Sequence, residues 1–168
     1  MNEQMGTVLE TIGIHEAAHV VVAARLEIVT MGFSFHPYGN NHNHAGAVDS
    51  GIPERDDPKS VRDHMVIDLA GLEAERRWEV IDPDLSAHAS YDLEHARVRA
   101  RTILGLLAEG AEVENLVERC RVDAARLVQE SYPEILLLGR DFADLMSRVV
   151  RLQRAEWWAL ERGSVDSI

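Results

Sequence analysis

Five consecutive residues near the N-terminus have the types and the spacing that bind a catalytic metal ion. His15-Glu16-Ala17-Ala18-His19 is an H-E-x-x-H segment. A helix has about 3.6 residues per turn, so positions four apart share a face and both imidazoles can hold one divalent ion, usually zinc. Glu16 can reach a water molecule at the open coordination position and act as a general base. The alternative is a pair of buried core histidines with no metal. A third ligand near these two residues would favour the metal site over that alternative.

The residues alone leave that third ligand open, because the chain contains 29 acidic residues and 8 histidines. Two segments stand out as possible sources of the third ligand, 69–75 and 89–96. Asp92 is one candidate, but the residues alone favour an ordinary acid in the first turn of a helix capped by Ser90, where a carboxylate complements the helix dipole. Glu73 competes with it, since some helical zinc peptidases take a glutamate from a second helix.

Four other histidines could enter a metal site. His42 and His44 lie in an Asn-rich segment typical of an exposed loop, and solvated side chains are the favoured interpretation. His88 and His95 flank Asp92 in the sequence, and a surface role is favoured for each.

Helices must position most of these side chains. Apolar residues around the histidines predict a first helix from about Thr7 to Leu26, buried on more than one side. The β-branched and aromatic residues of Glu27–Phe35 predict a strand, and Ala45–Val48 predicts a short second strand of a hairpin.

Apolar periodicity predicts further helices from Ser60 to about Glu79, from near Ser90 to 107, and over 113–128. Pro133 suits the first residue of a last long helix. The predicted fold is mostly α with a small β-hairpin, in a single domain over residues 1–168 whose core spans about 7–157.

Composition limits the possible partners and compartment. The net charge of −12 opposes binding to nucleic acid or to an anionic membrane. The single cysteine, Cys120, excludes an internal disulfide and suits a reducing cytoplasm, and its place in an apolar helical stripe predicts a core position. No secretory signal and no apolar stretch of about 20 residues is visible, so we expect a cytoplasmic protein without a membrane span.

Three short motifs resemble the peptidase domain of the FtsH-type, membrane-anchored ATP-dependent zinc proteases. That family carries H-E-A-G-H, then G-G-R-A-A-E, then G-A-S-N-D-L. This chain has H-E-A-A-H at 15–19, A-G-L-E-A-E at 70–75 and H-A-S-Y-D-L at 88–93, in the same order and with similar separation. The resemblance extends from about Thr11 to Arg154, although only the short motifs are specific.

The resemblance implies a role for each matching residue. His15 and His19 would be zinc ligands, Glu16 the catalytic base and Asp92 the third ligand, with Glu75 supporting the ligands. Glu73 falls where the family has alanine and is therefore the weaker candidate.

The chain also departs from the family. Ala18, Leu72 and Tyr91 stand where the family has glycine, arginine and asparagine. Ala18 adds only one methyl group, whereas Leu72 and Tyr91 are not expected to keep any role that the family's side chains have in ring assembly or in the shape of the substrate cleft. None of the three changes removes a ligand or the base. The only lysine, Lys59, follows Asp56-Asp57-Pro58, so the sequence contains no phosphate-binding G-x-x-x-x-G-K loop and no ATPase is expected.

The resulting expectation is a free-standing zinc-dependent, ATP-independent endopeptidase that acts on peptides or unfolded protein. A folded substrate would need a partner unfoldase, and we expect a monomer or a small homo-oligomer. One alternative is a zinc-binding regulator or partner-binding domain without useful turnover, with which the Trp157-Trp158 pair is compatible. Another is a peptidase that cleaves transcription repressors, which the segment at 88–93 disfavours.

Overall fold

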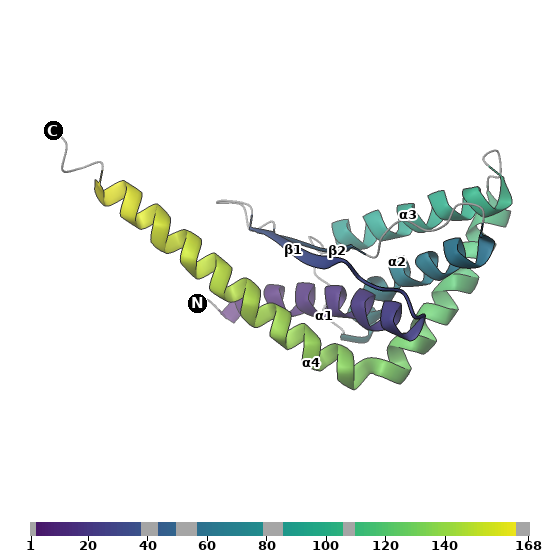
Figure 1. Ribbon diagram of the computed structural model, residues 1–168, viewed down its shortest axis with the longest axis horizontal. Helices are drawn as coiled ribbons and strands as arrows, with labels where there is room; N and C mark the ends of the chain where they lie inside the picture. The colour runs from purple at the N-terminus through teal and green to yellow at the C-terminus, as the bar shows by residue number, and fades with distance from the viewer. Residues whose placement is uncertain (1–2, 38–43, 50–56, 79–85, 106–109, 164–168) are drawn as a thin grey trace.

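A computed structural model describes residues 3–37, 44–49, 57–78, 86–105 and 110–163 (Figure 1). In these ranges the elements are, in chain order, the helix α1 (Glu3–Arg25), the strands β1 (Gly32–Pro37) and β2 (His44–Asp49), and the helices α2 (Pro58–Trp78), α3 (Ser86–Leu104) and α4 (Ala111–Gly163). The predicted mostly helical fold is confirmed. Within the same ranges no helix is both long enough and apolar enough to cross a bilayer.

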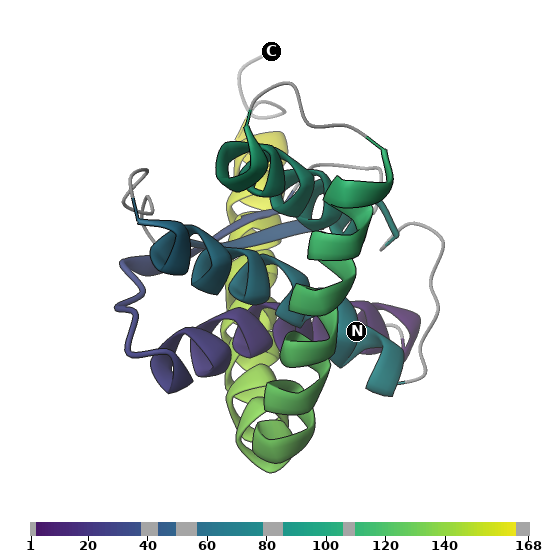
Figure 2. The same cartoon turned by 90° about the vertical axis from the view of Figure 1, so that its right-hand side faces the viewer.

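The helix α1 lies in the middle of the molecule, between α2 on one side and α4 on the other, and α3 packs against α2 (Figures 1 and 2). Its predicted burial on more than one side is confirmed, because Ala17, Ala18 and Val22 are inaccessible to solvent together with Ile14 at 2% exposure. The small side chains of Ala17 and Ala18 let the neighbouring helices approach closely. The H-E-x-x-H segment is therefore held inside the core.

Two glycines set the contact between α1 and α4. A Cβ atom added to Gly139 would lie 2.9 Å from the Cα of Ile14, and one added to Gly13 would lie 2.2 Å from the carbonyl oxygen of Gly139. Real Cβ atoms do not approach other atoms so closely, so the two backbones touch here because neither residue has a side chain. This crossing fixes where α1 lies on the long helix.

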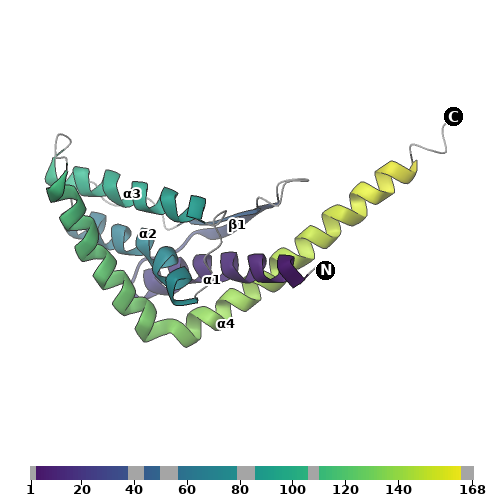
Figure 3. The ribbon, with the colours of Figure 1, turned by 180° about the vertical axis from the view of Figure 1, so that it is seen from behind.

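The last helix is continuous, and the predicted start of a separate helix at Pro133 is wrong. Pro133 lies inside α4, which bends sharply near its middle (Figures 1 and 3). Proline lacks the backbone N–H and its ring crowds the preceding turn, so it bends a helix where packing holds both sides in place. Ser131 and Ile135, on either side of it, are buried.

The two strands pair antiparallel, with Gly32 opposite Asp49 and Phe35 opposite Gly46. The second strand is confirmed, but the first begins at Gly32 and not at the predicted Glu27. Glu27 has a φ of 60°, and the N–H of Ile28 donates to the carbonyl of Ala23, so these residues close the end of α1. Helix termination thus overrides the local β propensity.

Cys120 is fully buried in the core, as predicted. Burial raises the pKa of its thiol to about 11, which leaves it protonated at neutral pH.

Candidate metal centre

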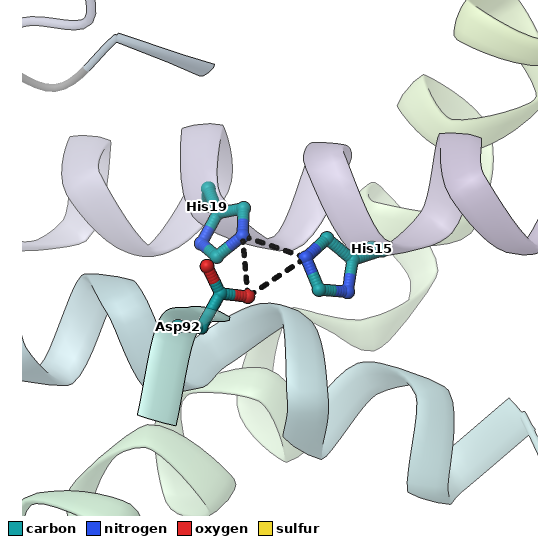
Figure 4. A group of neighbouring side chains, drawn as sticks. All are labelled: His15, His19 and Asp92. Carbon is teal, nitrogen blue, oxygen red and sulfur yellow. Dashed lines mark hydrogen bonds and ion pairs between the residues drawn. The ribbon is translucent and has the colours of Figure 1, made fainter. Parts of the chain in front are cut away.

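Three predicted ligands from two helices meet at one point. His15 and His19 project from α1, and Asp92 reaches them from α3 (Figure 4). The two Nε2 atoms lie 3.0 Å apart, and Oδ2 of Asp92 lies 3.0 Å from Nε2 of His15 and 3.6 Å from Nε2 of His19. The structure therefore places the two imidazoles and this carboxylate around a common centre.

These separations match the face of a small coordination tetrahedron. Zinc bonds to nitrogen and oxygen of about 2.0–2.1 Å in a tetrahedral arrangement give ligand atoms about 3.3 Å apart. The three measured edges of 3.0, 3.0 and 3.6 Å lie on either side of that value. Two nitrogens and one carboxylate oxygen also form a donor set that zinc accepts while keeping a position open.

Asp92 lies deeper in its helix than the sequence indicated. The helix α3 begins at Ser86, six residues before Asp92, so Asp92 lies in the second turn and Ser90 is an interior residue, not the cap. Residues 86–90 contain no proline or glycine, and the helix simply includes them. The first-turn dipole role considered for Asp92 is therefore wrong, and its contacts with the histidines are what distinguish it.

The other nitrogen of each imidazole is bound by α2. Nδ1 of His15 lies 2.7 Å from Oε1 of Glu75, and Nδ1 of His19 lies 2.7 Å from the carbonyl oxygen of Ile67. A neutral imidazole that donates from Nδ1 has an unprotonated Nε2, which is the form that binds a metal. The expected supporting position of Glu75 is confirmed as a contact, and α2 orients both rings.

Between these two contacts, Gly71 leaves room for a histidine ring. A Cβ atom added there would lie 2.5 Å from both Cε1 and Nε2 of His15. Ile67, Gly71 and Glu75 are spaced by four residues and so share one face of α2. On this face the carbonyl oxygen of Ile67 accepts a hydrogen bond from His19, Gly71 leaves space for the His15 ring, and the carboxylate of Glu75 accepts a hydrogen bond from His15.

Two buried carboxylate oxygens at the site make no well-aligned hydrogen bond in the described part of the chain. One is Oε2 of Glu16, whose residue is 3% exposed, and the other is Oδ2 of Asp92, which contacts the Nε2 atoms of His15 and His19 as an ion pair. An unpaired buried polar atom is costly, and native proteins keep one mainly where a ligand, an ion or a reaction uses it. Both atoms fit a site that receives a cation and a water molecule.

The charges of the cluster are strongly coupled. Burial alone raises the pKa of Asp92, but its close contacts with His15 and His19 outweigh burial and hold the pKa of that carboxyl well below its usual range. Burial lowers the pKa of both histidines, but contact with Asp92, and for His15 also with Glu75, raises the pKa of each above its ordinary value. The metal-free cluster therefore holds a proton that a metal would replace.

Glu73 does not join the cluster. Its carboxylate pairs with Arg76 at 2.6 Å and with Arg121 at 3.4 Å. His95 is exposed and meets Tyr91 edge to face, with ring centroids 6.3 Å apart, in agreement with the surface role favoured for it. The side chains of His42, His44 and His88 lie outside the described residues.

Sequence reasoning missed the buried ion pair beside the site. Nε of Arg99, on α3, donates to Oδ2 of Asp68, on α2, at 2.7 Å. Burial raises the pKa of Asp68, and the nearby charges of Arg99, His19 and Asp92 act on the same carboxyl. The pair ties α3 to α2 close to Asp92. The only sequence signal is an acid in the middle of an apolar helix stripe.

No protein-family model matches this chain, and no curated protein or solved structure is significantly similar to it.

We predict that Gly71→Ala lowers zinc affinity at least about tenfold, because the added methyl displaces the His15 ring from its place between α1 and α2. Competition with a chromophoric chelator measures the affinity. Gly32→Ala is the control, since its added methyl meets no atom within 4 Å. An unchanged affinity in Gly71→Ala would contradict the close packing of His15 on α2.

We also predict opposite pH dependences for zinc binding and for metal-free stability. The raised pKa values of His15 and His19 stabilise the metal-free fold below about pH 6.5, and this contribution is lost as pH rises through the folded-state values. Zinc must displace the same proton, so its affinity rises over that range. Urea unfolding in a chelator and zinc competition at about pH 5.5, 7 and 8.5 test both trends. A pH-independent zinc affinity would contradict this assignment, and His95→Gln serves as an exposed-histidine control.

Proposed function

We propose that this protein is a zinc-dependent, ATP-independent endopeptidase, with a zincin-like fold related to the FtsH-type peptidase domain. The observation that carries the proposal is the convergence of His15, His19 and Asp92 beside Glu16, the residue that follows the first proposed ligand, whose Oε2 atom is buried and has no hydrogen-bond partner among the described residues. A purely structural metal site needs four protein ligands and no base. Three ligands and a free carboxylate are what hydrolysis requires.

The chain's residues divide the work of peptide hydrolysis among them. A zinc ion held by His15, His19 and Asp92 would polarise the scissile carbonyl and lower the pKa of a bound water. Glu16 accepts the proton from the attacking water and delivers it to the leaving amine. Glu75 and the carbonyl of Ile67 hold the two imidazoles in the required tautomer.

The substrate we propose is a peptide or an unfolded protein. The sheet of β1 and β2 has two strands, so in the described part of the chain each strand has one edge without a partner strand. An extended peptide can add to such an edge through backbone hydrogen bonds, which gives affinity with little sequence specificity. A folded protein offers no free strand and would need a partner unfoldase.

We predict that Glu16→Gln lowers cleavage of an unfolded fluorescent casein by at least about 100-fold while zinc content stays the same, because the amide cannot accept a proton. The matched control is Glu10→Gln, an exposed position on the same helix. Removal of zinc by a chelator abolishes cleavage, and zinc restores it.

Equal cleavage by Glu16→Gln and the wild type would contradict the proposed role of the base. A wild type that binds zinc but cleaves no unfolded substrate would favour the alternative, a zinc-binding regulator that has lost turnover.

A further inference from the structure

Between residues 135 and 152, α4 has a covered apolar face and, on its outer side, three exposed leucines. The inner face packs into the protein and includes Ile135, Ala143, Met146 and Val150, each 8% exposed or less. On the outer side, Leu137 and Leu152 are each 66% exposed and Leu145 is 49% exposed. Single exposed leucines are ordinary on a protein surface, so the arrangement of these three decides whether they matter.

The exposed leucines form one line with two charged residues. Leu137, Asp141, Leu145, Arg148 and Leu152 are spaced by four, four, three and four residues, and all five are exposed. At about 100° per residue they fall within a stripe about 80° wide, which we call the outer seam. The side chains of Asp141 and Arg148 form no hydrogen bond or ion pair within the described ranges. They are seven residues, or about 10 Å, apart along the helix and cannot reach each other.

The outer seam is open to a partner helix. Beyond the bend, α4 runs past the rest of the protein, and its C-terminal part projects from the body (Figures 1 and 3). The buried face is opposite the seam, so a helix that lies along the seam would meet the body of neither molecule.

We propose that the outer seam binds the same seam of a second copy, with the two helices antiparallel. The pattern is self-complementary about a point between residues 144 and 145. Leu137 and Leu152 lie at equal distances on either side of this point, seven residues before 144 and seven after 145. Asp141 and Arg148 also lie at equal distances from it, three residues before 144 and three after 145. Reversal of a second helix therefore sets leucine beside leucine and aspartate beside arginine, twice each, with Leu145 of both copies at the centre.

This match selects a second copy over an unrelated protein. An isologous interface requires one patch to be complementary to itself, and a patch shaped for another protein has no such requirement. A parallel pairing of the same helices would set Asp141 against Asp141 and Arg148 against Arg148. Like charges in these positions disfavour that arrangement.

The dimer is expected to depend on concentration. The seam from Leu137 to Leu152 is about 22 Å long, shorter than the contacts of stable coiled coils and smaller than a standard protein interface. The inference is independent of the proposed peptidase function, because the seam contains no residue of the metal centre.

Charge reversal tests the pairing by sedimentation velocity over a concentration series up to about 0.5 mM. The wild type is expected to shift from 18.8 kDa toward about twice that mass. Asp141→Arg and Arg148→Asp should each weaken association at least about tenfold, and the double variant should restore it. Glu112→Arg, exposed at the other end of α4, is the control of equal charge change.

Cysteine cross-linking tests the antiparallel order. Under oxidation, Leu137→Cys mixed with Leu152→Cys should give a disulfide-linked dimer, while each variant alone should give no disulfide-linked dimer. Cys120 is buried and should take no part. Three results would overturn the proposal: a wild type that is monomeric throughout the series, association unaffected by either charge reversal, or self-cross-linking of Leu137→Cys alone.

Discussion

The arrangement of the site depends on the contact between α1 and α2. An imidazole on an isolated helix can rotate about two bonds, and two such rings point their Nε2 atoms at one centre only if both are held. Here the carboxylate of Glu75 and the carbonyl of Ile67 bind the opposite nitrogens, and Gly71 leaves the space in which the His15 ring lies. The direction of both imidazoles is therefore set in the metal-free protein, which would lower the entropic cost of binding a metal ion there.

A cluster of this kind is costly to bury. His15, His19 and Glu16 are each less than 9% exposed, and Asp68 lies beside them at 9%. Burial of ionisable groups is unfavourable unless partners or a metal compensate. Packing of the helices and ion pairing both help to offset this cost. The glycine crossing of α1 on α4 and the Asp68–Arg99 pair between α2 and α3 hold the helices that carry the ligands.

The sequence predicted what short-range helical geometry controls. The spacing of His15 and His19 requires one shared helix face, and the structure has it. Asp92 could be preferred to Glu73 only through a resemblance, because the residues alone left the third ligand open. In the structure Glu73 instead pairs with Arg76 and Arg121. The predicted helix start at Pro133 was wrong because packing on both sides keeps a bent helix continuous. The predicted start of β1 was wrong because the left-handed turn at Glu27 closes the end of α1, and the strand begins only at Gly32. Gly71 and Arg99 act through neighbours on other elements, which no local pattern reveals.

We propose that His15, His19 and Asp92 hold one zinc ion. Elemental analysis of zinc per chain, after reconstitution and removal of excess metal, tests it most directly for the wild type beside Asp92→Ala, with Glu73→Ala as control. We predict about one zinc in the wild type and in the Glu73→Ala control and a clear loss in Asp92→Ala. Equal zinc in all three would contradict the role of Asp92, and a wild type that retains no zinc would contradict the metal centre itself.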